Sequence, residues 1–237
     1  MDANYYNTGW ESEWDDMKQY GPFSRHLRRL LISQLHKISF KSLLDVGCGQ
    51  GSFLYELQNI FPDVDFHGSD FSSSALDLAS KKISNCEFNE MDITSDLLDR
   101  KFDVVICSEV LEHIENDEVA INNLCTMTQK FLLVSSPQGR MRKFEERVVG
   151  HVRNYAKGEL VEKLISAGVE PLDVIEWGFP FYSPLYRNYL ELTNAYGTSR
   201  KFNSGKKLIS NLIYNLFLCN SSRRGDEIII LSRVVNN

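Results

Sequence analysis

The chain has 237 residues, 43% of them hydrophobic and 24% charged, which provides enough apolar surface for a sizeable core and excludes wholesale disorder. Its net charge of −6 and isoelectric point near 5.4 argue against a general nucleic-acid binder. The five cysteines are never spaced as CxxC, and no run approaches the roughly 18 apolar residues of a membrane-spanning helix. The first residues are acidic, unlike those of a secretory signal. We therefore expect a cytoplasmic globular protein without stable membrane insertion.

The first forty residues are predicted to form a helical cap or lid. Pro22 suits the first turn of a helix, and the segment after it carries aliphatic residues at helical spacing. These residues are Leu27, Leu30, Leu31, Leu35 and Ile38. Aromatic residues also occur in this region, and they either stack on a methyl acceptor or pack against the sheet. They are Tyr5, Tyr6, Trp10, Trp14 and Tyr20.

Short apolar runs then alternate with helical stretches. Strands are predicted at residues 42–47, 65–70, 86–92, 102–110 and 130–137. The segments between them, such as GSFLYELQNI and SSSALDLASKK, repeat apolar residues at i, i+3 or i+4. This alternation of strand and helix predicts an α/β protein, in which a parallel sheet is covered by helices on both faces.

After residue 155 the pattern continues with a helix closed by Gly168, a strand at 171–178 and a final strand at 227–234. The two strands are separated by an insertion, 179–226, which is too long for a simple hairpin and is predicted to contain two helices. We therefore divide the chain into four parts. They are an N-terminal helical cap (1–40), a core (41–178), a helical insertion (179–226) and a last core strand (227–237).

The second helix of the insertion has a broad apolar face. The face is formed by Leu208, Ile209, Leu212, Ile213, Leu216 and Phe217. Core packing, a lid or a homodimer seam are favoured over a membrane anchor, because the helix is short and its polar face is modest. The nearby pairs Lys206–Lys207 and Arg223–Arg224 are interpreted as solvated surface charge, with an anionic substrate or membrane headgroups as the alternative.

The run DVGCGQG (45–51) lies where the first strand turns into the next helix. Gly47, Gly49 and Gly51 permit positive φ and let the backbone approach a ligand, while the following helix directs its free N–H groups at the turn. Asp70 follows nineteen residues after Gly51, a spacing at which a carboxylate can accept ribose hydroxyl protons. The spacing GxGxG differs from the GxGxxG of dinucleotide-binding folds.

With these features the chain resembles the class I S-adenosylmethionine-dependent methyltransferases over nearly its full length. The matching pieces are LLDVGCGQGSF, GSDFSSSALDLASKK, the MD of NEMDI, FDVVICSEVLEHI, FLLVSSP and the terminal strand pair. The resemblance implies a Rossmann-like sheet of seven strands, mostly parallel, with helices on both faces and a helical insertion before the last strand. We expect that last strand to run antiparallel beside the fifth.

The resemblance also implies a site for S-adenosylmethionine. The glycine turn would hold the methionine half of the cofactor, with Asp45 supporting the loop. Asp70 would hold the ribose, and Phe71 would pack beside the adenine. Asp92 and Ile93 match the positions that meet the adenine ring and its amino group.

The sulfonium pocket is expected at the end of the fourth strand, where Ser108 and Glu109 match the positions that line it. Glu109, Glu112 and His113 are three and four residues apart, so one helical turn would bring them to one side, and His151 follows the fifth strand. Methyl transfer to a hydroxyl requires a well-placed nucleophile and the loss of a proton. His113, His151 and Glu109 are therefore the candidate catalytic residues.

Two carboxylates and two imidazoles at one edge would also form a divalent metal site, with Glu109, Glu112, His113 and His151 as ligands of Mg²⁺ or Mn²⁺. An ExxEH run with a later His resembles the metal-dependent small-RNA 2′-O-methyltransferases and the O-methyltransferases of ubiquinone biosynthesis. In that arrangement the metal holds the acceptor hydroxyl and lowers its pKa. Similar runs occur in metal-free methyltransferases, where one imidazole would act as general base, so both hypotheses stay open.

The sequence thus predicts an S-adenosylmethionine-dependent methyltransferase that acts on an oxygen of a small molecule or glycan precursor. N-methylation of an amine, methylation of RNA, and a non-catalytic cofactor-binding module that regulates a partner are the alternatives. The acidic total charge weighs against a nucleic-acid substrate.

Overall fold

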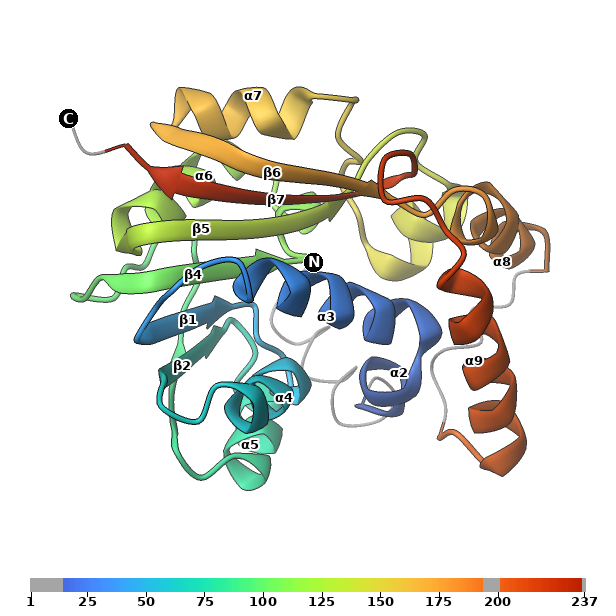
Figure 1. The fold of residues 1–237 in the computed structure, drawn as a ribbon, viewed down its shortest axis with the longest axis horizontal. Helices are drawn as coiled ribbons and strands as arrows, with labels where there is room; N and C mark the ends of the chain where they lie inside the picture. Colours follow the sequence, from blue (N-terminus) through green and yellow to red (C-terminus); the bar gives the residue numbers. More distant parts are fainter. Residues whose placement is uncertain (1–14, 194–200, 236–237) are drawn as a thin grey trace.

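The computed structural model describes residues 15–193 and 201–235, and a mixed seven-stranded sheet forms the centre of the described chain (Figure 1). The strands are β1 (Ser42–Val46), β2 (Asp65–Asp70), β3 (Cys86–Glu90), β4 (Phe102–Ser108), β5 (Thr128–Pro137), β6 (Val169–Trp177) and β7 (Glu227–Val234). Their order across the sheet is β3-β2-β1-β4-β5-β7-β6. The predicted seven-stranded fold is confirmed.

The first five strands are parallel because a helix or helical turn returns the chain between most of them. β4, with the sequence FDVVICS, is buried along nearly its whole length, as expected for a strand covered on both faces. β7 pairs antiparallel with both β5 and β6, with Val134 opposite Ile230 and Ile175 opposite Ile229. The expected antiparallel last strand beside β5 is therefore confirmed.

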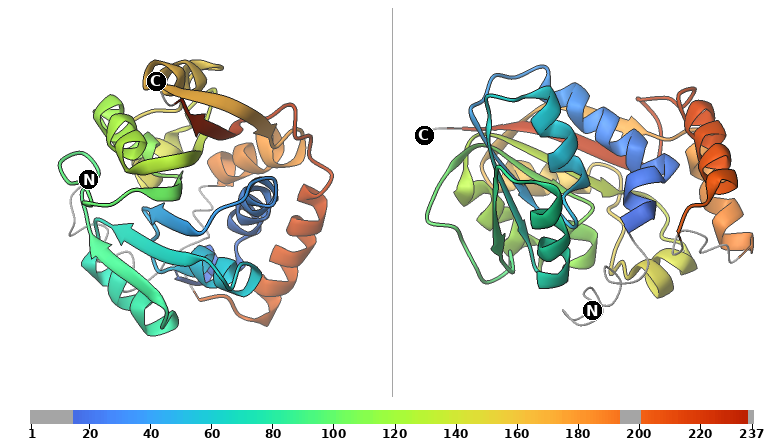
Figure 2. Two further views of the ribbon diagram at one scale, coloured as in Figure 1. Left: turned by 60° about the vertical axis from the view of Figure 1, so that its left-hand side comes forward. Right: turned by 90° about the horizontal axis from the view of Figure 1, so that it is seen from below.

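Helices cover both faces of the sheet (Figure 2). α3 (Pro22–Leu35), α4 (Ser52–Ile60) and α5 (Ser73–Lys82) contribute to one apolar layer, which includes Leu31, Leu54 and Leu76. α6 (Asp117–Met127) and α7 (Glu159–Ser166) contribute to the other, which includes Leu124 and Leu160. Each helix buries one stripe of apolar side chains, in agreement with the spacing in the sequence.

Further helical segments gather at the end of the sheet where the parallel strands terminate (Figure 1). They are α2 (Asp15–Tyr20), the 3₁₀ turn η1 (Leu111–His113), the π-helical segments η2 (Glu145–Val149) and η3 (Phe181–Tyr186), α8 (Arg187–Thr193) and α9 (Ser204–Phe217). These segments place polar residues from distant parts of the chain around one edge.

An aromatic cluster joins η3 to α3 and α9. The ring of Tyr182 stacks on Phe23 at 4.7 Å and on Trp177 at 5.0 Å, and Phe217 meets Trp177 edge-on at 5.7 Å. Trp177 and Phe217 are buried. These aromatic residues therefore pack between the added helices and the sheet.

Of the N-terminal aromatic residues, only Tyr20 lies within the described chain. Lys207 lies over its ring, 3.8 Å from the centroid, and Phe202 is 6.3 Å away. The other four aromatic residues of that prediction, Tyr5, Tyr6, Trp10 and Trp14, lie outside the described residues. The role of this region as a lid stays a prediction.

The broad apolar face of α9 is divided between the core and the surface. Phe217 is buried and Ile213 packs against the core, as core packing requires. Leu208, Leu212 and Leu216 are exposed in the described structure. None of the helices in the described ranges combines the length and apolar character that crossing a bilayer would require.

Candidate active site

The parallel strands β1, β2, β3, β4 and β5 all end at the same edge of the sheet, and the candidate residues follow those ends. The carboxyl ends of parallel strands form the usual ligand-binding edge of open α/β sheets. Side chains from one edge can therefore act on one ligand.

The glycine turn after β1 adopts the conformation that the sequence predicts. Gly47, Gly49 and Gly51 have φ of 76°, 55° and 77°. A Cβ atom added at Gly47 would lie 2.2 Å from Cγ2 of Val110, so only glycine fits between this loop and the residues that follow β4. The backbone N–H of Gly47 donates to the carbonyl of Ser69 at 2.8 Å, which fixes the turn against the end of β2.

Asp70 ties the glycine turn to the start of α5. Its Oδ2 accepts from the backbone N–H of Gly49 at 2.8 Å and its Oδ1 from that of Ser72 at 2.9 Å. Burial raises the pKa of Asp70, and hydrogen bonds from Ser72 and Gly49 oppose the rise. Asp45 lies buried nearby, and burial together with the charge of Asp70 raises its pKa to about 8. The structure thus brings the two predicted acids to the glycine turn.

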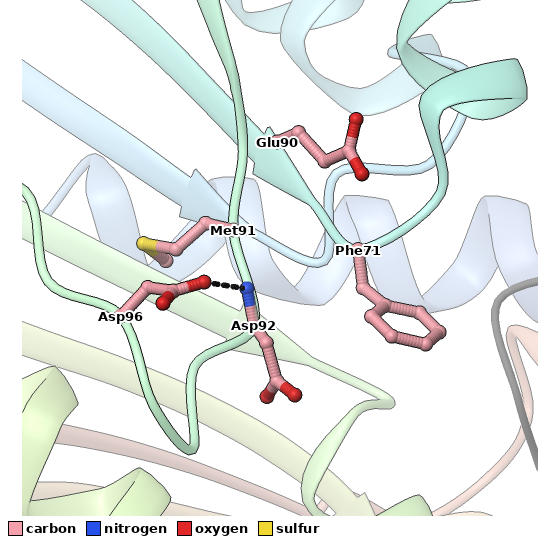
Figure 3. A pocket seen from close by; sticks show the side chains of 5 residues that line it. All are labelled: Phe71, Glu90, Met91, Asp92 and Asp96. Carbon is pink, nitrogen blue, oxygen red and sulfur yellow. Dashed lines mark hydrogen bonds between the residues drawn. The ribbon is translucent and has the colours of Figure 1, made fainter.

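A pocket of about 370 Å³ opens beside the end of β3. Phe71, Glu90, Met91, Asp92 and Asp96 line it. Figure 3 shows the Phe71 ring and the Asp92 carboxylate extending in the same direction, while Asp96 turns back to accept from the backbone N–H of Asp92 at 2.8 Å. An aromatic face beside a carboxylate can stack on a planar ring and accept from its amino group.

Ile93 is placed differently from the other predicted pocket residues. Its side chain belongs to the apolar core, and its carbonyl accepts from Asn123 Nδ2 at 2.7 Å. It is not among the residues that line the pocket.

The chain turns sharply after β4 at Glu109, whose φ is 58°, a left-handed conformation that is uncommon for residues other than glycine. The N–H of Glu109 donates to the carbonyl of Ser135 at 3.1 Å, and its Oε1 accepts from Ser135 Oγ at 3.3 Å. The hydroxyl groups of Ser108 and Ser135 are 2.8 Å apart. Ser108 and Glu109 therefore line the strand ends together with β5.

Glu112, His113 and His151 come together next to this turn. One potential ligand atom from each lies within 4.8 Å of the others. Nε2 of His113 is 3.9 Å from Oε1 of Glu112, and the two imidazole rings meet edge-on at 4.9 Å. Carboxylate oxygen and imidazole nitrogen at such spacing can hold a divalent ion.

Glu109 is not part of this group of three. The sequence prediction placed Glu109 and Glu112 on one helical turn, but η1 begins only at Leu111 and Glu109 precedes it in the left-handed conformation. The helical spacing therefore does not apply to Glu109.

The environment of the group of three is buried and polar. Glu112 is fully buried, its Oε2 accepts from Ser136 Oγ at 2.8 Å, and its Oε1 has no hydrogen-bond partner among the described residues. Burial, followed by the charge of Glu109, raises the pKa of Glu112. Burial and the neighbouring His151 lower the pKa of His113 to about 3, and burial also lowers that of His151. Both imidazoles are therefore neutral at neutral pH.

A chain of buried polar residues orients His151. Arg187 Nε donates to Glu145 Oε1 at 2.8 Å, and Asn154 Nδ2 donates to Glu145 Oε2 at 3.1 Å. Oδ1 of Asn154 then faces His151 Nδ1 at 3.2 Å. Because the Glu145 carboxylate can only accept, the Asn154 amide must direct its N–H₂ group toward Glu145. The amide oxygen of Asn154 then faces His151, which places the proton of His151 on Nδ1.

Sequence reasoning missed this chain because Glu145 lies in the charged run RKFEERVV, where nothing distinguishes it from the exposed Glu146. It also missed Glu227, which is fully buried and whose two carboxylate oxygens accept from no donor group of the described residues. Burial and the adjacent Glu109 raise the pKa of Glu227. The sequence did contain a signal for Glu227, which is the first residue of the last strand. Because this strand runs antiparallel to β5, it begins at the edge where the parallel strands end.

Comparisons with known proteins concern the family and the fold of the chain. Residues 39–188 match a family model described as a methyltransferase domain. The ubiquinone biosynthesis O-methyltransferase of Rickettsia canadensis is 30% identical over 158 residues, which cover 59% of this chain and 67% of that protein. The malonyl-[acyl-carrier protein] O-methyltransferase of Bacillus cytotoxicus is 28% identical over 112 residues, which cover 45% of this chain and 39% of that protein.

The putative methyltransferase 235L of Invertebrate iridescent virus 6 is 29% identical over 96 residues, which cover 40% of this chain and 36% of that protein. The match therefore spans less than half of the viral and Bacillus relatives' own length.

Solved structures share the fold. The N-methyltransferase NodS of Bradyrhizobium japonicum WM9, in complex with S-adenosyl-L-homocysteine, has a TM-score of 0.64 at 17% identity, with 98% of each chain covered. The magnesium protoporphyrin IX methyltransferase of Synechocystis PCC 6803 with bound S-adenosylmethionine has a TM-score of 0.53 at 17% identity, with 89% of this chain and 77% of that chain covered. At such identities the likeness concerns the fold.

Proposed function

The chain belongs to the class I S-adenosylmethionine-dependent methyltransferases, and we propose that it transfers a methyl group to a hydroxyl oxygen of a small-molecule or glycan-type acceptor, with a divalent ion at the Glu112–His113–His151 group. The observation that carries the proposal is the meeting of these three side chains at the edge of the sheet. The Rickettsia and Bacillus relatives are both named O-methyltransferases, which supports oxygen as the acceptor atom.

The glycine turn and its acids fit the cofactor. The Asp70 carboxylate accepts from the backbone N–H groups of Gly49 and Ser72, and because a carboxylate has about four lone-pair sites, it can also accept from a ribose hydroxyl. In the pocket beside β3, Phe71 offers a stacking face for the adenine. The N–H and the hydroxyl of Thr94 both donate to Oδ1 of Asp92, so Oδ2 can accept from the adenine amino group.

The residues present also fit a divalent ion. A fully buried carboxylate with one unpartnered oxygen, as at Glu112, is costly without a compensating cation. The neutral imidazoles of His113 and His151 are in the protonation state that metal binding requires. We assign Glu112, His113 and His151 as the ligands of the ion. We assign Glu109 to contact with the methyl acceptor.

A bound divalent ion supplies Lewis acidity, which lowers the pKa of an acceptor hydroxyl. The chain's own residues provide the rest. Glu109, held in its left-handed conformation by Ser135, is placed to orient the acceptor, and the buried surroundings exclude water from it. Nucleic acid is disfavoured as the acceptor by the net charge of −6.

The direct test is methyl transfer from labelled S-adenosylmethionine to a panel of phenols, catechols, sugars and amines, with the methylated atom identified by NMR. We expect an O-methyl product, activity abolished by EDTA, and recovery with Mg²⁺ or Mn²⁺. Glu112→Gln should lower turnover on the order of a hundredfold and leave S-adenosylhomocysteine affinity unchanged.

Glu115→Gln is the matched control, because Glu115 is exposed three residues further along the chain. It should retain full turnover. Activity that is indifferent to EDTA would exclude the ion and favour an imidazole general base. Methylation of amines alone would exclude the hydroxyl acceptor.

A further inference from the structure

α9 is attached to the rest of the molecule through one of its faces. Phe217 is buried in the aromatic cluster, and the carbonyl of Tyr214 accepts from His26 Nε2 at 2.8 Å. Arg25 Nη1 donates to Asn211 Oδ1 at 2.7 Å. These contacts with α3 fix the rotation of the helix, so its opposite face cannot turn inward.

The opposite face of α9 presents four aliphatic side chains to solvent. Leu208, Ile209, Leu212 and Leu216 are 61%, 58%, 62% and 46% exposed. Their spacing of one, three and four residues places them on a single stripe along the helix. A continuous stripe of this kind, unlike scattered surface leucines, marks an interaction surface.

The apolar surface continues at the same end of the molecule. Leu185, Tyr189 and Leu192, in η3 and α8, are also exposed, and α8 lies beside α9 in the ribbon (Figure 1). We call the exposed side chains of α9 and this neighbouring group the α8–α9 surface.

The segment that contains α9 carries charge of one sign, and acids of other segments lie next to it, since Asp16 accepts from the backbone N–H of Phe202 and α8 contains Glu191. Residues 201–225 contain Lys201, Lys206, Lys207, Arg223 and Arg224 and no aspartate or glutamate. The rest of the chain is acidic, since the whole carries a net charge of −6. The positive charge therefore adjoins the exposed aliphatic stripe along the chain, and Lys207 and Arg224 also lie over the rings of Tyr20 and Phe179.

The sequence alone favoured other roles for this helix over a membrane anchor, but from the exposure of its aliphatic stripe we infer that the α8–α9 surface binds the interface of an anionic lipid bilayer. An amphipathic helix that lies in the plane of a membrane inserts its aliphatic stripe below the headgroups, while nearby lysines and arginines contact the anionic lipids. A second copy of the chain fits less well, because a two-fold interface through this surface would bring the five cations of each copy into one interface. A protein partner is disfavoured because the α9 stripe is purely aliphatic, and Tyr189 of α8 is the one exposed aromatic residue among those that define this surface, whereas Trp, Tyr and Arg anchors dominate protein interfaces.

The test is sedimentation of the purified chain with vesicles of phosphatidylcholine containing 30 mol% phosphatidylglycerol, and with vesicles of phosphatidylcholine alone. We expect binding to the anionic vesicles that weakens as NaCl is raised, and little binding to the neutral ones. Leu208→Ser with Leu212→Ser should lower the partition coefficient at least tenfold, and Lys206→Gln with Lys207→Gln about tenfold.

The matched control is Ile165→Ser with Leu172→Ser, two exposed aliphatic residues on α7 and β6, away from α9 (Figure 1). It should bind vesicles as the unaltered chain does. Unchanged S-adenosylhomocysteine affinity verifies that each variant is folded. Absence of vesicle binding, or binding independent of lipid charge and salt, would overturn the inference. A dimer without lipid would also overturn the inference, if sedimentation equilibrium shows it for the unaltered chain and not for the Leu208→Ser with Leu212→Ser variant. In that case a second copy of the chain would cover the surface.

Discussion

The carboxylate of Asp70 is engaged by two backbone N–H groups, from Gly49 and Ser72, in the described structure. It therefore shapes the glycine turn as well as offering acceptors for a ribose. Asp70→Ala should weaken S-adenosylhomocysteine binding by about 1–3 kcal/mol, the cost of losing hydrogen bonds to a charged acceptor. Isothermal titration calorimetry measures this directly. Asp63→Ala, an exposed position just before β2, should bind normally, and equal affinity in both variants would remove the ribose assignment.

The proton position on His151 depends on a residue that does not touch it. In Glu145→Gln the remaining side-chain oxygen should stay with Arg187, so the new amide N–H₂ would face Asn154. Asn154 would then turn over and offer its own N–H₂ to His151 Nδ1. We expect His151 to change from the Nδ1–H to the Nε2–H tautomer, which ¹⁵N NMR of labelled imidazole distinguishes.

The exposed neighbour provides the control for this prediction. Glu146→Gln should leave the His151 tautomer as it is in the unaltered chain. The same tautomer in all three proteins would mean that the polar chain does not control His151.

At the scale of elements, the sequence predicted the strands well because each is a short apolar run bounded by turns. Residues 65–70 and 227–234 coincide with β2 and β7, and 42–47 exceeds β1 by one residue. The glycine turn was predictable because positive φ and close approach demand glycine. These features depend on local chemistry, which the sequence carries directly.

The parts that failed depend on contacts distant in the chain. The left-handed conformation of Glu109 is stabilised by Ser135 of β5, so helical spacing could not reveal that Glu109 precedes the turn that carries Glu112 and His113. The burial of His26 depends on α9, which lies almost two hundred residues away in the chain. The exposure of Leu208 and Leu212 was equally hidden, since an apolar stripe in a sequence does not state what covers it.

The contact between α3 and α9 contains a pH-dependent element. His26 is fully buried, and burial, opposed by the hydrogen bond to Tyr214, lowers its pKa to about 4. The unfolded chain takes up this proton near pH 6.5, whereas the folded chain resists it until about pH 4. The free energy of unfolding should therefore fall as the pH falls through this window, by about 2–3 kcal/mol.

Urea unfolding between pH 7 and pH 4.5 tests this expectation against two variants. His26→Gln should lose that part of the pH dependence, whereas His36→Gln, at an exposed position at the end of α3, should keep it. Identical slopes for His26→Gln and the unaltered chain would contradict the assignment.

At the scale of the whole molecule, ligand binding and folding are linked because the cofactor residues come from several strand ends. S-adenosylhomocysteine at a hundred times its dissociation constant should stabilise the folded chain by about 2.7 kcal/mol, which corresponds to a rise in Tm of roughly 5–10 °C. At the same concentration, a tenfold weaker variant such as Asp70→Ala should show about half of this rise. Thermal scans measure both, and no rise for the unaltered chain would contradict cofactor binding by the folded state.

β7 is the last strand in chain order, yet it lies between β5 and β6. During synthesis, β5 and β6 leave the ribosome well before residues 227–234, and until then each has an edge with unpaired N–H and C=O groups. Such edges recruit other strands, and they make an incomplete chain a candidate for aggregation or for chaperone retention. The nascent protein thus depends on the synthesis of one eight-residue segment to close its sheet, and a ribosome that pauses before Glu227 prolongs the interval in which the open edges are exposed.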